Sequence, residues 1–180
     1  MSPVPADDPA LALAIDFLNT YDNLETPPDQ LSLDLVRRLA TRHSFGSLPL
    51  AGLESLRALR ERLRPVFAAP ELADKVAALN HVLQAAAASA SVRLVDDRAA
   101  LYATGGRGES GEFAVLIADA LTRALAAGGP ARFGTCAADP CRCVYVDRTR
   151  SGRQRYCCEL CNDRVAAAAY RRRKSPSSGA

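Results

Sequence analysis

Two cysteine-rich stretches decide how the C-terminal part of the chain folds: CAADPCRC at residues 136–143 and CCELC at residues 157–161. All six cysteines of the 180-residue chain lie in them. Each stretch can present a pair of thiolates, and two pairs form the tetrahedral sulfur site that zinc favours. A module of about 40 residues buries too little apolar surface to be stable alone, so bound metal would supply folding energy. The sequence therefore predicts a Zn²⁺ site.

Spacing alone leaves the four ligands open. The first pair is Cys136/Cys141 or Cys141/Cys143, and the second is Cys157/Cys161 or Cys158/Cys161. The alternatives to a metal site are buried free thiols or a local disulfide, which paired spacings in a reducing compartment disfavour. A catalytic cysteine is disfavoured because residues 132–180 contain no histidine to act as its base. Since four thiolates also leave zinc no open position for water, we expect no enzyme and no catalytic residue.

The segments around the second cysteine stretch predict a hairpin and a helix. Val144–Val146 is expected to pair with Arg155–Tyr156 across a turn that contains Gly152. Glu159–Lys174 predicts a helix, because its acidic residues come early and its cations late, which suits the helix dipole. Together they predict a small treble-clef or ribbon-like zinc finger. The helix face expected to pack on the hairpin carries Leu160, Ala167 and Tyr170.

Charge divides the chain into two parts. Residues 1–131 carry 12 Lys and Arg against 16 Asp and Glu, a net charge of −4, whereas residues 132–180 carry 11 against 4, a net charge of +7. A basic segment on a mildly acidic body favours nucleic acid as a partner, although a solvated helix end is the alternative. We expect Arg164 to project outward and contact base edges, and Arg171–Lys174 to contact phosphates. The candidate contacts are Arg148, Arg150, Arg153, Arg155, Arg164, Arg171, Arg172, Arg173 and Lys174.

The preceding residues predict a mainly helical body. Leucines recur at steps of three or four in Leu53–Phe67, and Asp8 and Ser32 are typical helix caps. Ser91–Val95 and Ala99–Ala103 flank a turn and predict a small β-hairpin. The expected fold class is therefore mainly α with a small β-hairpin. The expected division is a helical domain at residues 1–130, a zinc finger at 131–174 and a disordered tail at 175–180.

Asp16, Asn19 and Thr20 form a polar cluster at three- and four-residue steps, so they share one helix face. They could line a small-molecule pocket. Such residues more often cap a helix and hold a neighbouring loop, and we favour that structural role.

No stretch reaches the roughly 20 apolar residues that cross a bilayer. The first residues lack the positive and apolar regions of a secretion signal. We therefore expect no membrane partner and a cytoplasmic location.

The finger region carries four short motifs: Cys136-x4-Cys141, Tyr145-x-Asp147, Arg155-Tyr156-Cys157 and Cys161-Asn162-Asp163-Arg164. In these motifs it resembles the CGNR zinc finger of bacterial regulators. Asn162-Asp163 replaces the family's Gly-Asn. The resemblance implies that Cys143 and Cys158 are extra and that the ligands are Cys136, Cys141, Cys157 and Cys161.

The stretch Asp16-Phe17-Leu18-Asn19-Thr20 is similar to the Asp-Phe-x-Asn-Thr of the ABATE domain that usually precedes this finger. The two resemblances imply a stress- or ligand-responsive transcription regulator. Its N-terminal domain would receive a small-molecule or protein effector, and its finger would bind DNA. A homodimer is compatible with this interpretation. The alternative is a zinc-scaffolded protein–protein adaptor whose arginines meet an acidic partner.

Overall fold

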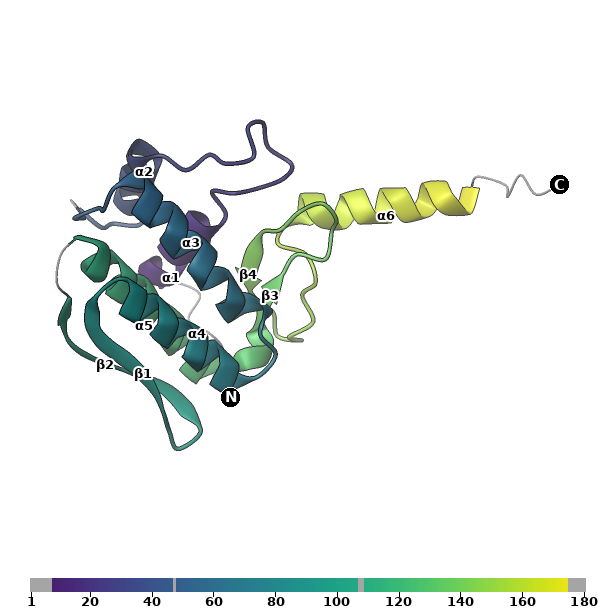
Figure 1. Cartoon of the computed structure of the whole chain (residues 1–180). Helices are drawn as coiled ribbons and strands as arrows, with labels where there is room; N and C mark the ends of the chain where they lie inside the picture. Colours follow the sequence, from purple (N-terminus) through teal and green to yellow (C-terminus); the bar gives the residue numbers. More distant parts are fainter. Residues whose placement is uncertain (1–7, 47, 107–108, 175–180) are drawn as a thin grey trace.

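A computed structural model describes residues 8–46, 48–106 and 109–174 (Figure 1). The predicted tail at 175–180 lies outside these residues. The prediction of a mainly α fold with small β-hairpins is confirmed. The elements are α1 (Pro9–Leu18), α2 (Leu33–Arg42), α3 (Leu53–Ala68), α4 (Leu72–Ala85), β1 (Ala88–Val95), β2 (Arg98–Gly106), α5 (Glu109–Gly128), a 3-10 turn (Pro130–Arg132), β3 (Phe133–Thr135), β4 (Val144–Val146) and α6 (Glu159–Lys174).

Side-chain caps begin the first two helices. The Asp8 carboxylate accepts hydrogen bonds from the amides of Ala10 and Leu11 at 2.9 and 3.1 Å. The Ser32 hydroxyl accepts one from the amide of Leu35 at 3.1 Å. Each cap satisfies amides that have no partner inside the helix, so both helices begin where the sequence predicts.

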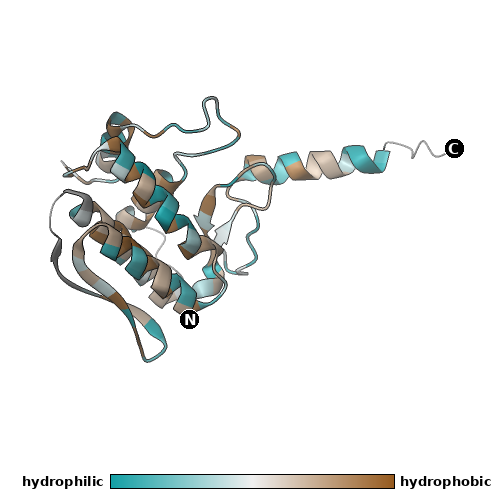
Figure 2. Cartoon of the chain, in the orientation of Figure 1, coloured by the Kyte–Doolittle hydropathy of each residue, from teal (hydrophilic) through white to brown (hydrophobic). Residues whose placement is uncertain are grey.

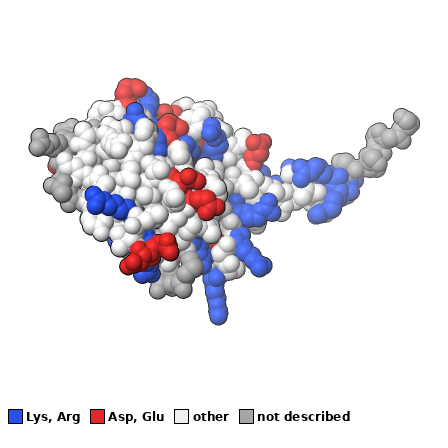
Figure 3. Space-filling model, turned by 60° about the horizontal axis from the view of Figure 1, so that its bottom comes forward, with Lys and Arg blue, Asp and Glu red and all other residues white. Residues whose placement is uncertain are grey.

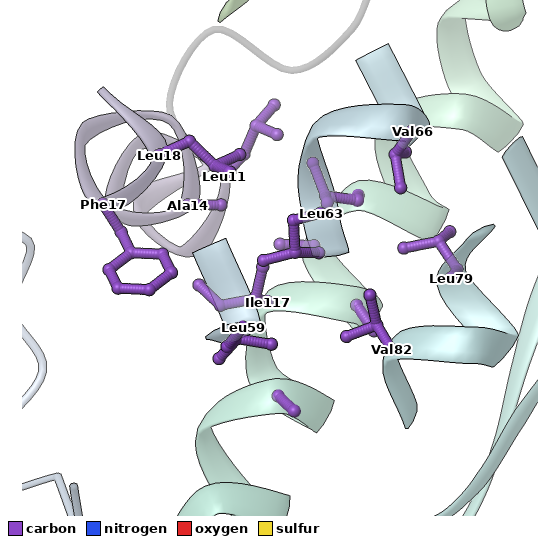
Figure 4. Packing of buried hydrophobic residues seen from close by; sticks show 14 of the residues in the cluster. Leu11, Ala14, Phe17, Leu18, Leu59, Leu63, Val66, Leu79, Val82 and Ile117 are labelled. Atoms are coloured by element: carbon purple, nitrogen blue, oxygen red, sulfur yellow. The ribbon is translucent and has the colours of Figure 1, made fainter. Parts of the chain in front are cut away.

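Helices α1, α3, α4 and α5 bury a common apolar core. The rings of Phe17 and Phe113 meet edge to face at 5.2 Å and join α1 to α5. Figure 4 shows apolar side chains from these helices pointing toward one another, including Leu11, Leu63, Leu79 and Ile117. The leucine spacing in α3 is thus explained by one buried face.

The predicted hairpin in the body is confirmed as the antiparallel pair β1–β2. Val95 faces Arg98, so Asp96 and Asp97 alone form the turn, and both have positive φ, at 49° and 57°. That left-handed pair matches the twist of the flanking strands. The sheet packs against α4 and α5.

The predicted hairpin of the finger is wrong in its pairing. β4 pairs antiparallel with β3, which precedes the first cysteine, and not with Arg155–Tyr156. The reason is burial: Phe133, Val144 and Val146 all enter the core of the body. The tilted rings of Phe67 and Phe133, 5.2 Å apart, fix β3 on α3.

The apolar core therefore continues past residue 130 into the first half of the finger. The second half leaves the body, and α6 extends away from it (Figure 1). Figure 2 shows a hydrophilic C-terminal end on this helix.

Candidate metal centre and basic surface

Four cysteine sulfurs converge beside the body. Cys136 follows β3, Cys141 lies in the loop before β4, Cys157 precedes α6 and Cys161 lies in its first turn. Their Sγ atoms lie within 4.8 Å of one another, with 3.8 Å between Cys141 and Cys157 and 3.7 Å between Cys157 and Cys161. Sulfurs bound to zinc at about 2.3 Å in a tetrahedron lie about 3.8 Å apart. The donor set and its spacing therefore fit zinc.

Backbone hydrogen bonds fold the chain around these sulfurs. The amide of Cys141 donates to the carbonyl of Ala138, and that of Cys136 donates to the carbonyl of Cys143, both at 2.8 Å. The amides of Cys143 and Cys157 donate to the sulfurs of Cys141 and Cys136 at 3.5 and 3.4 Å. Such N–H groups stabilise negative charge on sulfur, which is the form that binds a metal.

Burial opposes ionisation of these thiols. It raises the pKa of Cys157 far above that of an ordinary thiol and raises the pKa of Cys161 to about 12. Burial also acts upward on the pKa of Cys136, but hydrogen bonds from the backbone of Cys157 and Ala138 leave it below the ordinary value. A bound cation would replace the thiol protons, so metal affinity falls as pH falls. Four sulfur ligands leave no position for water, which is typical of a structural site.

The other two cysteines lie beside this group. The sulfur of Cys143 is buried and lies within 4.8 Å of both the Asp22 carboxylate and the Cys141 sulfur. Burial raises the pKa of Cys143. Cys158 is exposed, and its sulfur lies 3.8 Å from that of Cys157. The structure thus brings together the four cysteines that the CGNR resemblance implied.

Asp147 organises the loop that follows β4. Its side chain is 2% exposed, and its carboxylate accepts hydrogen bonds from the amides of Thr149 and Gln154 at 2.8 and 2.9 Å. Burial acts upward on the pKa of Asp147, but these hydrogen bonds leave it below the usual value. The Tyr145 hydroxyl donates to the carbonyl of Gln154 at 2.7 Å, and Gly152 turns the chain at φ 64°. These hydrogen bonds therefore tie Thr149 and Gln154 of the loop to the end of β4.

Exposed cations lie on this loop and on α6. Figure 3 shows lysine and arginine crowded along the projecting helix and beside it. Positive charge along one arm suits contact with the phosphates of a nucleic acid. All of the following predicted side chains are exposed: Arg148, Arg150, Arg153, Arg155, Arg171, Arg172, Arg173 and Lys174.

Arg164 does not project outward as expected. It is half-buried, its Nη2 donates to the carbonyl of Ala138 at 2.7 Å, and the same nitrogen lies 3.9 Å from the sulfur of Cys161. Its Nε is buried with no hydrogen-bond partner among the described residues. The guanidinium therefore faces the cysteine group.

The packing predicted for α6 is also wrong. Leu160 is 80% exposed and Tyr170 is 57% exposed, so neither packs on a hairpin. Cys161 is the buried residue of this helix. The reason is that β3 and β4 lie in the core of the body, whereas α6 packs on the cysteine group through Cys161 and Val165.

The polar cluster of α1 divides among different partners. Asp16 lies 2.8 Å from Nε2 of His43. The Thr20 hydroxyl accepts a hydrogen bond from Arg60 at 3.0 Å. Asp16 and Asn19 line an open pocket of about 440 Å³ beside β4. The three residues therefore do not converge on one site, and Asn19 reaches the finger.

A group of hydrogen bonds clasps the cysteine-bearing part of the finger to the body. The Asn19 amide group donates to the carbonyl of Val144 at 3.0 Å and accepts from its amide at 2.8 Å. Arg64 and Asn23 donate to backbone carbonyls within residues 136–143, at 3.0 and 2.8 Å. We call these three side chains the clasp.

Sequence reasoning missed the roles of Asn23, Arg64 and Gly134. A Cβ at Gly134 would come within 2.5 Å of the Tyr145 ring, so β3 needs glycine there. Helix periodicity marks Arg64 only as a polar position, and no local signal links it to a loop some 78 residues away along the chain.

Within the described residues, no helix has both the length and the apolar character to cross a membrane.

Comparison with known proteins agrees with this architecture. No curated protein matches the chain. Residues 132–174 match the model of the CGNR zinc finger. Residues 11–139, more than half of the chain, match the model of the ABATE family, whose description reads "Putative stress-induced transcription regulator". The chain therefore belongs to the ABATE family and carries a CGNR zinc finger at its C-terminal end.

Proposed function

We propose that this chain is a DNA-binding transcription regulator whose finger is held by Zn²⁺ on Cys136, Cys141, Cys157 and Cys161. The observation that carries the proposal is the course of α6. The helix begins at the cysteine group and ends in four exposed cations, free of the body. The family description supports regulation of transcription at the coarse level.

When bound, zinc would join the two cysteine pairs and so fix the direction of α6. The arginines of the loop at 147–155 and those at the end of α6 would then contact phosphates from two places. The Ala166–Ala169 run keeps the middle of α6 narrow, and the major groove of DNA admits an α-helix. Exposed side chains of this helix would then contact the DNA bases.

The body is proposed to receive the effector. A cavity of about 450 Å³ lies between α3 and α4, lined by the apolar Leu56 and Leu59 together with Glu54 and Arg62. Such a lining suits a small amphipathic molecule. Because α3 also carries Arg64 of the clasp, a shift of this helix would reach the cysteine loop.

The experiment is DNA retention by the zinc-loaded full chain across a range of salt concentrations. We expect the logarithm of the binding constant to fall linearly with the logarithm of the salt concentration. Arg171→Gln should reduce that slope by about one unit, as loss of a phosphate contact does. Arg37→Gln is the matched control, because Arg37 is an exposed cation on α2 of the body, and its slope should equal that of the wild type.

A protein–protein adaptor is the second candidate, and the exposure of Leu160 and Tyr170 on α6 favours it. Apolar side chains on a projecting helix suit a protein partner. If zinc-loaded protein retains no DNA at the lowest salt, while Cys157→Ser still unfolds the finger, the adaptor replaces the DNA-binding regulator.

A further inference from the structure

Arg164 joins the two halves of the cysteine group. Its guanidinium comes from α6, three residues after Cys161, and donates to the carbonyl of Ala138 in the loop between the first two cysteines. Ala138 is fully buried, and the neighbouring residues Cys136 and Cys141 are buried as well. The bond therefore crosses from the helix to the loop inside the module.

Charge explains why a cation should lie here. Four thiolates around a divalent ion carry a net charge of −2. Buried charge is costly without a partner, and a guanidinium is suited to compensate it because it keeps its proton and is weakly hydrated. Nη2 of Arg164 already lies 3.9 Å from the Cys161 sulfur.

A second donor of Arg164 also supports a role beside the thiolates. Its Nε–H is buried and meets no acceptor among the described residues. A cysteine sulfur becomes a stronger acceptor when metal binding converts it to a thiolate, since bonds to charged groups are the stronger ones. A thiolate at Cys161 would therefore be a stronger acceptor for the guanidinium, whose Nη2 already faces that sulfur.

We propose that Arg164 is a positioning residue of the metal centre, serving as counter-ion to the thiolates and as a brace between α6 and the cysteine loop, and not a contact to DNA bases. This inference rests on the proposed zinc site but not on DNA binding. It assigns sequence readout to other side chains of α6, because a guanidinium held by Ala138 is directed into the protein.

The test is zinc transfer from the full chain to an excess of a chromophoric chelator at constant pH. Arg164→Gln should hold zinc 10- to 100-fold more weakly than the wild type, the usual effect of losing a residue that supports metal ligands. Arg171→Gln removes the same charge from an exposed site and should hold zinc as the wild type does. Arg164→Lys keeps the charge without the planar fork, so it should fall between Arg164→Gln and the wild type.

Wild-type zinc retention in Arg164→Gln would overturn the inference. If Arg164→Gln fails to fold, wild-type retention in Arg164→Lys would overturn it in the same way. The salt slope of DNA binding is measured on the same zinc-saturated proteins. Arg164→Gln should keep the wild-type slope, and a slope lowered as in Arg171→Gln would make Arg164 a DNA contact instead. If the wild type binds zinc but no DNA, the proposed DNA-binding function is wrong. The role of Arg164 is then decided by the zinc measurement alone.

Discussion

Asn19 contacts β4 as a neighbouring strand would. Its side-chain amide offers a donor and an acceptor in the geometry of a peptide group, and both are used by Val144. Asn80 makes the same pair of hydrogen bonds with Val92 of β1: it donates to the carbonyl at 2.7 Å and accepts from the amide at 2.6 Å. In both places an asparagine, directly after α1 or within α4, satisfies backbone groups at the edge of a two-stranded sheet, where they would otherwise lack partners.

Replacement of Asn19 by alanine should lower the free energy of unfolding by about 2–4 kcal/mol, because the buried N–H and C=O groups of Val144 both lose their partner. Urea unfolding of the metal-loaded protein measures this. Asn23→Ala is the control, since its bond to Pro140 is exposed, and its cost should be below about 1 kcal/mol. Equal stability of Asn19→Ala and wild type would contradict the structural role of this residue.

Two buried or half-buried cations have hydrogen-bond partners that are distant in sequence, so their roles could not be predicted from the residues around them. Lys75 is a charged residue of α4, yet it is fully buried and donates to the carbonyl of Val66 at 2.7 Å. Burial lowers its pKa to about 8. In the sequence, Arg164 is likewise one of several cations in a basic helix, and its bond to Ala138 is evident only in the structure. Neither contact has a local pattern from which it could be predicted.

At the scale of elements, a row of arginines on α3 holds the loop after α1. Arg60 is 3% exposed and donates to Asp29 at 2.7 Å, and Arg57 donates to the same carboxylate at 3.1 Å. Arg60 and Arg64 also lie over the ring of Tyr21, at 5.4 and 5.6 Å from its centroid. This loop carries Asn23, so the row of arginines supports the clasp.

The Arg60–Asp29 pair should make stability depend on acid pH. The hydrogen bond from Arg60 lowers the pKa of Asp29 to about 2. Because the pKa is lower in the folded than in the unfolded protein, the stabilisation is present above about pH 4 and is lost as pH falls toward 2. The difference in unfolding free energy between wild type and Asp29→Asn should therefore be about 2 kcal/mol at pH 7 and shrink between pH 4 and 2.

Urea unfolding at a series of pH values measures this difference. Asp34→Asn is the control, because Asp34 is 73% exposed and pairs with Arg38 of the same helix. Its effect should stay below about 0.5 kcal/mol at every pH. A difference for Asp29→Asn that does not change between pH 4 and 2 would contradict the assignment.

The helices could be predicted from sequence and the finger strands could not. Caps such as Ser32 and the regular leucines of α3 are local signals, so they predict the elements where they occur. β3 and β4 have three residues each, which is too few for a period of two to be recognised. Their pairing is set by burial of Phe133 and Val146 in a core made by other elements.

At the scale of the whole molecule, body and finger share structure. The core passes through β3 and β4, and the clasp holds the cysteine loop from outside. The four-cysteine grouping could be predicted because the CGNR resemblance distinguishes it from the other pairings, which spacing alone left open. The projection of α6 could not, since Leu160 and Tyr170 have the periodicity of a packed face. The result is a base with one continuous core, from which one basic helix extends (Figure 1).

The zinc content of the purified chain tests the four-cysteine site directly. We expect about one zinc per wild-type chain and one per Cys158→Ser chain, because Cys158 lies outside the four-cysteine group. Cys157→Ser should hold much less. Less than about half an equivalent in the wild type, or equal loss in the Cys157→Ser and Cys158→Ser variants, would contradict a zinc site made of these four cysteines.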